Sequence, residues 1–101
     1  MSAEDILFLV QCETEVPFSK MKQENQKRCR TTNILFARYV AITMMIEEQI
    51  SAIEIAKVFE VDRASIYYTK KTVNDLLTNN RPFKTMYLAC IKRMADMEDA
   101  A

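Results

Sequence analysis

The sequence of 101 residues contains no glycine and only two prolines. Tight hairpin turns between β-strands depend on positive φ angles, which glycine adopts at least cost, so this chain is poorly suited to an antiparallel β fold. Half of the residues are hydrophobic, which is enough for one core in a chain of this length. We therefore predict an all-α fold, a compact orthogonal bundle of five to six helices that forms a single domain over residues 1–101.

Apolar periodicity and capping residues predict where the helices begin and end. Ser51 followed by Glu54 has the spacing of a capping box, and Asp62 is expected to cap the helix that follows. Pro82 fits the first position of the last helix, where its missing N–H is not needed. Thr78, Asn79 and Asn80 are expected to form the turn before it. The helical segments predicted are 2–15, a short turn at 18–22, 33–48, 51–59, 63–77 and a last helix from 82.

The residues available for chemistry do not favour an enzyme or a metal site. The chain has no histidine, and its three cysteines, Cys12, Cys29 and Cys90, form no CxxC pair. Zinc would have too few ligands, and the usual general base is missing. We expect inert thiols, no cofactor and no catalysis. There is no apolar run of membrane-spanning length and no signal peptide, so a cytoplasmic location without membrane contact is expected.

Cationic side chains are concentrated in two stretches, although the formal net charge is zero. Residues 18–46 contain six Lys or Arg and one Glu, a balance of +5, and residues 63–93 contain seven Lys or Arg and one Asp, a balance of +6. Such segregation can form one basic face on a neutral molecule. A dispersed, solvated surface is the alternative.

Residues 51–77 have the pattern of a helix-turn-helix, with a short helix, a three-residue turn and a longer helix. Ala56 provides the small residue where the helices cross, and Ile66 the apolar residue that packs the second helix back. Ile55 and Phe59 form the apolar side of the first helix. The usual glycine of the turn is absent, and Glu60 is expected to occupy its position.

The second helix of this motif has an outward face that suits DNA. At 100° per residue, Ile66, Val73 and Leu77 point inward. The residues predicted to point outward are Arg63, Ala64, Tyr67, Tyr68 and Lys71. Phenol rings can pack on thymine methyl groups or sugars, and arginine can bind guanine or phosphate. The alternative is that the tyrosines cover a neighbouring helix or a dimer contact.

Three stretches of the sequence follow one another in an order that is typical of a known family: RCRTTNILFARYVAITMM, SAIEIAKVFEVDRASIYY and TMYLACIKRM. A basic loop is followed by a long helix with an Ala-Arg pair, a hairpin with an acidic cap, and a terminal helix. This order resembles the C-terminal DNA-binding domain of the bacterial replication initiator DnaA, which is related to the Trp-repressor-like helix-turn-helix group. The resemblance spans about residues 6–95 and implies a DNA-binding module.

The resemblance also implies roles for individual residues. Arg28 belongs to the family's basic lead-in, and Arg30 has the place of an arginine that enters the minor groove. Arg38 matches an arginine that contacts phosphate, and Ile53 an apolar residue that touches a thymine methyl group.

The chain departs from the family at the start of the recognition helix. The family's Asp-His-Thr-Thr, whose side chains contact base edges, is replaced here by Asp62, Arg63, Ala64 and Ser65. The family's two-glycine turn is shortened to Glu60-Val61. We therefore expect the phosphate contacts to persist and the recognised sequence to differ. The family's ATPase domain is absent, since no GxxxxGK[ST] loop occurs.

The leading hypothesis is sequence-specific binding to double-stranded DNA, in an accessory replication or transcription-regulatory role. Arg30 would reach the minor groove; Arg38, Lys70 and Lys71 would hold phosphates; Arg63, Ser65 and Tyr68 would enter the major groove.

The second hypothesis is a protein-interaction module that keeps the fold without binding DNA. The zero net charge, the acids Glu47, Glu48, Glu54 and Glu60, and exposed apolar side chains expected at Ile42 and Ile46 favour it. A homodimer is compatible with either hypothesis.

Overall fold

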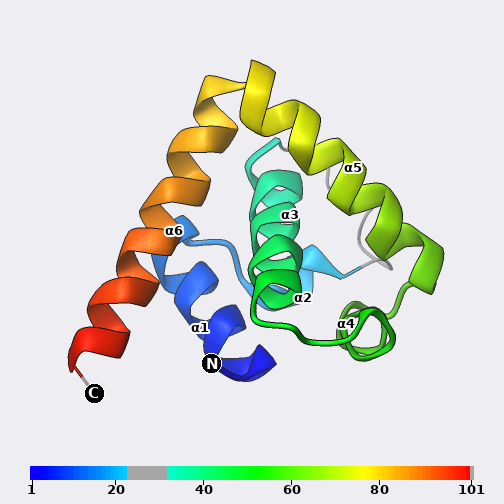
Figure 1. Ribbon diagram of the computed structural model, residues 1–101, viewed down its shortest axis with the longest axis horizontal. Coiled ribbons are helices and arrows are strands. Elements are labelled where there is room, and N and C mark those ends of the chain that lie inside the picture. Colours follow the sequence, from blue (N-terminus) through cyan, green and yellow to red (C-terminus); the bar gives the residue numbers. More distant parts are fainter. Residues whose placement is uncertain (23–31, 101) are drawn as a thin grey trace.

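In the computed structural model, which describes residues 1–22 and 32–100, the chain forms an all-α bundle (Figure 1). The described residues contain six helices and no strand, as the sequence predicts. The helices are α1 (Ala3–Thr14), α2 (Phe18–Met21), α3 (Thr32–Glu47), α4 (Ala52–Phe59), α5 (Arg63–Asn79) and α6 (Arg81–Ala100).

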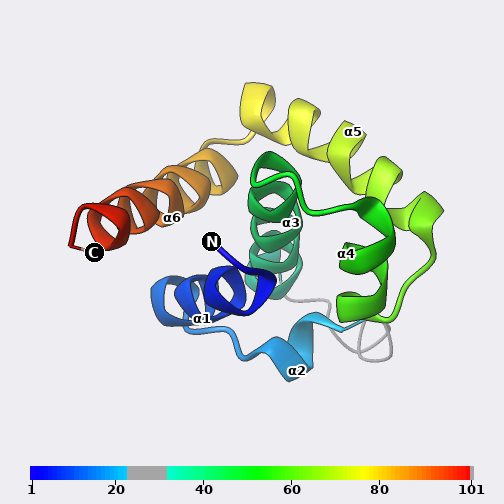
Figure 2. The ribbon, with the colours of Figure 1, turned by 60° about the horizontal axis from the view of Figure 1, so that its bottom comes forward.

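Helix α3 lies at the centre of the bundle and packs against each of the other five helices (Figures 1 and 2). Its successive residues Val40, Ala41 and Ile42 point in different directions, yet all three are fully buried. A helix that is buried all round has neighbours on every side. The prediction that Ile42 is exposed is therefore wrong, and Ile46 is half-buried.

Four of the other helices form two pairs around α3 (Figure 1). α1 packs on α6 at one side, and α4 packs on α5 at the other. The apolar face of α1 is formed by four residues that all belong to the core, Ile6, Leu7, Leu9 and Val10. No described helix is both long and apolar enough to cross a membrane.

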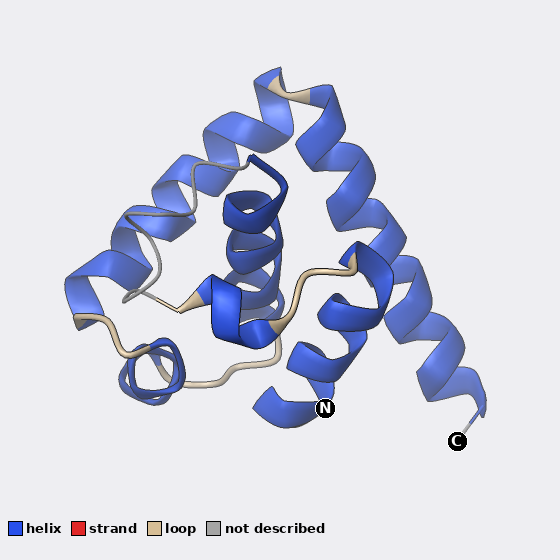
Figure 3. Ribbon diagram, turned by 180° about the vertical axis from the view of Figure 1, so that it is seen from behind, coloured by secondary structure: helices blue, strands red, loops and turns tan. Residues whose placement is uncertain are grey.

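The corner between α5 and α6 is tighter than predicted, as Figure 3 shows at the top of the molecule. Helix α5 continues through Asn79, so that Asn80 alone separates it from α6. The Oδ1 atom of Asn80 accepts a hydrogen bond from the backbone N–H of Phe83 at 3.0 Å, which makes Asn80 the cap of α6. Because α6 begins at Arg81, Pro82 occupies its second position and not the first.

The caps of the helix-turn-helix pattern are only partly as predicted. The hydroxyl of Ser51 accepts a hydrogen bond from Glu54 N at 3.2 Å, as expected for the start of α4, but the Glu54 carboxylate does not return the bond that would complete the predicted capping box. Asp62 stands at the N-cap of α5 with extended backbone, but its carboxylate makes no cap hydrogen bond. The backbone carbonyl of Asp62 instead accepts a hydrogen bond from Ser65 N at 2.9 Å, so the capping role predicted for this side chain is wrong.

Three of the described helices end in left-handed residues that are not glycine. Glu15 after α1 has φ 61°, Gln49 after α3 has φ 64°, and Glu60 after α4 has φ 57°. At the end of α3, Gln49 N donates to Ile46 O and Ile50 N donates to Met45 O, both at 3.0 Å. This is the Schellman pattern, in which glycine is the preferred residue. Each of these ends therefore stores a conformational cost that a glycine would remove.

Replacing Gln49 by glycine is expected to raise the free energy of unfolding by about 0.5–1 kcal/mol, because glycine adopts positive φ without a steric penalty. Urea unfolding followed by circular dichroism measures the change. The control is Lys92→Gly at an exposed position within α6, which should lower stability by a similar amount. Destabilisation by both variants would contradict the left-handed conformation of Gln49.

Candidate nucleic-acid interface

The α4–α5 hairpin has the arrangement expected of a helix-turn-helix. Residues 60–62 join the two helices, and in Figure 1 α4 is viewed almost end-on while α5 lies across the picture, so the helices cross steeply. Ile55, Ala56 and Phe59 of α4 are buried, as is Ile66 early in α5. These are the residues that the sequence predicts for the packed side of the motif, and Glu60 adopts the predicted left-handed conformation.

Helix α2 supports this hairpin, a contact that sequence reasoning missed. The rings of Phe18 and Phe59 meet edge to face with centroids 5.6 Å apart. Lys22, next to α2, pairs with Glu60 of the turn at 3.2 Å from Nζ to Oε2. The same ammonium group lies 5.2 Å from the Phe18 ring centroid. Because these residues are about 40 positions apart, local patterns give no signal for the contact.

Arg38 is placed beneath the hairpin and not at its surface. Only 5 % of the residue is exposed, and its guanidinium carbon lies 5.9 Å from the centroid of the Phe59 ring. A cation over an aromatic face is favourable, more so when water is excluded. A phosphate contact by Arg38 stays a prediction, and its burial argues against it.

The outward face of α5 is as predicted. Ile66, Thr69 and Val73 are buried on the inner side, where the Thr69 hydroxyl donates to Ser65 O at 2.9 Å. Tyr67 and Tyr68 are 60 % and 67 % exposed. The other exposed residues of this helix that the sequence assigned to DNA are Arg63, Ala64, Lys70 and Lys71, whereas Ser65 is half-buried.

A shallow hollow of about 520 Å³ lies between α4 and the start of α5. Ile53, Asp62 and Arg63, three of the predicted contact residues, line it together. Lys57 also lines it and is a cation that the sequence analysis did not single out. The structure therefore brings an exposed apolar side chain, two cations and the two acids Glu60 and Asp62 together at the N-terminal end of α5.

Acidic residues near the hairpin are largely engaged. Glu60 pairs with Lys22, as described above, and Glu48 pairs with the N-terminal ammonium of Met1 at 3.5 Å. Glu47 accepts a hydrogen bond from the hydroxyl of Tyr87 at 2.7 Å. Of the described residues, no carboxylate lies within ion-pair distance of the exposed cations Lys57, Arg63, Lys70 and Lys71. The outward side of α5 thus carries cations that form no ion pair with a described carboxylate.

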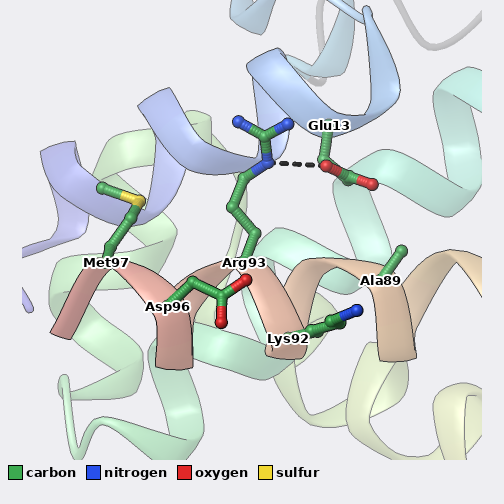
Figure 4. A pocket seen from close by; sticks show the side chains of 6 residues that line it. All are labelled: Glu13, Ala89, Lys92, Arg93, Asp96 and Met97. Atoms are coloured by element: carbon green, nitrogen blue, oxygen red, sulfur yellow. Dashed lines mark hydrogen bonds and ion pairs between the residues drawn. The ribbon is translucent and has the colours of Figure 1, made fainter. Parts of the chain in front are cut away.

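A larger hollow of about 630 Å³ lies between α1 and α6, on the opposite side of the molecule from α5 (Figures 1 and 4). Arg93 crosses it to Glu13, with 2.6 Å between Nε and Oε2. The pairing raises the pKa of Arg93, chiefly through this hydrogen bond. Because its arginine is paired with Glu13, this hollow presents no free arginine to a polyanion. Its ion pair ties α1 to α6.

Burial suppresses the ionisation of two core side chains. Burial, and then the charge of Glu13, raise the pKa of Cys90 to about 12, and burial followed by the bond to Glu47 raises the pKa of Tyr87. Both stay neutral at neutral pH, so neither can serve as a nucleophile there. In the described residues, no group of three His, Cys, Asp or Glu side chains could hold a metal ion.

Cys90 should therefore be protected from alkylation in the folded protein, whereas the exposed Cys12 should react. At pH 8 we expect iodoacetamide to modify Cys12 faster by at least about tenfold, as read from the masses of the two tryptic peptides. Because the pKa of Cys90 is raised from 9.0, its contribution to stability is present below pH 9 and is lost as the pH rises toward 12. Equal alkylation rates for Cys12 and Cys90 in the folded protein would contradict the burial of Cys90.

Two of the predicted contact residues, Arg28 and Arg30, lie outside the described residues. Comparison of the chain with protein-family models, with curated proteins and with solved structures finds no match.

Proposed function

We propose that the protein binds double-stranded DNA, with α5 in the major groove, and recognises a specific sequence there. The proposal rests on one observation, the outward face of α5. This face presents exposed cations and two exposed tyrosines, while the opposite face is packed against the core. The resemblance to the DNA-binding domain of the replication initiator supports it, as does a steeply crossed helical hairpin. The role would be accessory to replication or transcription.

Within this proposal the described residues have distinct tasks. Arg63, at the N-terminal end of α5, would address a base edge, because this end of a recognition helix approaches the bases. Tyr68 and the half-buried Ser65 would lie in the same groove. Lys70 and Lys71 would contact phosphates, which fix position without specifying sequence. The minor-groove contact of Arg30 remains a prediction from the sequence alone.

The alternative, a protein-interaction module, loses part of its support. It relied on exposed apolar residues of α3, but Ile42 is fully buried. It also relied on acids near the hairpin, of which Glu47, Glu48 and Glu60 are engaged with other groups. The zero net charge remains in its favour. Under the leading proposal the chain has a binding role and no catalytic one.

Salt dependence of binding tests the phosphate contacts. Lys70→Ala and Lys71→Ala are each expected to weaken binding to all duplexes alike and to lower the slope of log K against log salt concentration by about 0.9, since each removes one counterion-releasing contact. Fluorescence anisotropy with labelled duplexes from 50 to 200 mM salt, about the range over which such effects are large, gives the slope. Lys92→Ala on α6 is the matched control and should leave it unchanged. If the unsubstituted protein retains no duplex at low salt, the proposed function fails.

A further inference from the structure

Exposed apolar side chains are concentrated on the α4–α5 hairpin. Of the six large hydrophobic residues that are exposed in the described parts of the chain, Ile53, Tyr67 and Tyr68 belong to these two helices. Covering such side chains releases free energy roughly in proportion to the apolar area removed from water. A ligand with apolar groups at this surface would therefore be favoured.

The same face offers little hydrogen bonding to bases. Of the side chains that form paired hydrogen bonds with a single purine, residues 63–71 contain Arg63, Lys70 and Lys71 but no Asn or Gln, and the proposed function assigns the two lysines to phosphates. Asn74 follows 11 residues after Arg63, roughly 16 Å further along the helix axis. Hydrogen bonding by these residues can thus specify few positions, and further discrimination needs another kind of contact.

The spacing of the two tyrosines suits such a contact. Tyr67 and Tyr68 are three and four residues after Ala64, so both rings lie next to the small methyl side chain of Ala64 on the helix surface. Ala64 is exposed, and its short side chain allows the helix backbone to approach a groove closely between the rings. The face therefore presents two exposed aromatic rings beside a small side chain, with Arg63 and Lys71 near its two ends.

We infer that this surface recognises the 5-methyl group of thymine, so that the target contains A·T pairs distinguished by direct apolar contact with Tyr67 and Tyr68. Thymine methyl is the apolar group that a base pair of unmodified DNA presents in the major groove. The inference rests on the proposed binding of duplex DNA and names the chemistry that this site selects. The rings, and not the hydroxyl groups, provide the discrimination.

The test compares a selected duplex with the same duplex in which uracil replaces thymine, a change that removes only the methyl group. Each methyl group in contact should contribute about fourfold in Kd, the equivalent of one buried carbon. Tyr67→Phe and Tyr68→Phe should keep the difference between the two duplexes, whereas the Tyr67→Ala, Tyr68→Ala double variant should lose it. Leu88→Ala, at a similarly exposed position on α6, is the control and should keep it.

The outcomes separate this inference from the function on which it rests. Equal affinity for the thymine and uracil duplexes would overturn the inference and leave duplex binding intact. Loss of the difference in both Phe variants would also overturn it, because the hydroxyl groups would then be responsible. If no duplex of either kind is retained at low salt, the proposed function fails, and the inference fails with it.

Discussion

Replacing Phe59 by alanine is expected to lower the free energy of unfolding by about 3–5 kcal/mol, the usual range for a buried phenylalanine. Phe59 is fully buried at the end of α4, where its ring contacts Phe18 of α2 and lies under the guanidinium of Arg38. The substitution therefore removes the contact that joins α2, α3 and α4. Chemical unfolding followed by circular dichroism measures the loss.

Phe8→Ala is the matched control for this prediction. Phe8 lies on α1 and is 63 % exposed, so the same chemical change there should alter stability by only about 0.5 kcal/mol. A loss of less than about 1 kcal/mol at Phe59 would contradict its place in the core, because even partial relaxation of the cavity leaves a larger cost.

Replacing Arg63 by alanine is expected to weaken binding to the preferred duplex by about 10- to 100-fold, the contribution of one good contact between an arginine and a base. Arg63 is exposed at the first position of α5 and lines the hollow between α4 and α5. Binding to unrelated duplexes should fall much less. Anisotropy titrations with both duplexes give the ratio of the two affinities, which is the quantity that Arg63 controls.

Two further variants isolate the role of Arg63. Arg63→Lys keeps the charge but loses the planar guanidinium group. The ratio of the affinities for the preferred and the unrelated duplex should therefore fall, while the affinity for unrelated duplexes is kept. Arg81→Ala removes an equally exposed arginine that stands 18 residues further along the chain, at the start of α6, and should change neither affinity. Equal loss of affinity for both duplexes in the alanine variant would show that Arg63 holds a phosphate and not a base.

The outward face of α5 could be predicted from the sequence because this helix has one packed side. Periodicity at 100° per residue correctly assigned Ile66 and Val73 inward and Tyr67 and Tyr68 outward. The same reasoning failed for Ile42. Periodicity locates an apolar stripe but does not give the number of neighbours, and α3 is surrounded by the other five helices.

Contacts between distant residues could not be predicted in this way. The family resemblance implied a phosphate contact for Arg38, but this residue is buried, and its guanidinium lies over the ring of Phe59, which is 21 residues away. The pairing of Lys22 with Glu60 likewise depends on how α2 packs. The capping side chains were also predicted incorrectly. Asp62 was expected to cap α5, but its carboxylate makes no cap hydrogen bond, whereas Asn80, expected only in a turn, caps α6.

Selection from a random duplex library tests the central claim most directly. The purified protein is incubated with the library at moderate salt, and the bound fraction is recovered, amplified and sequenced over several rounds. Our account predicts an enriched element containing A·T pairs. Palindromic half-sites about one helical turn apart would indicate a dimer, and a single asymmetric element a monomer. Recovery without enrichment would contradict sequence-specific binding, and no recovery even at low salt would contradict DNA binding altogether.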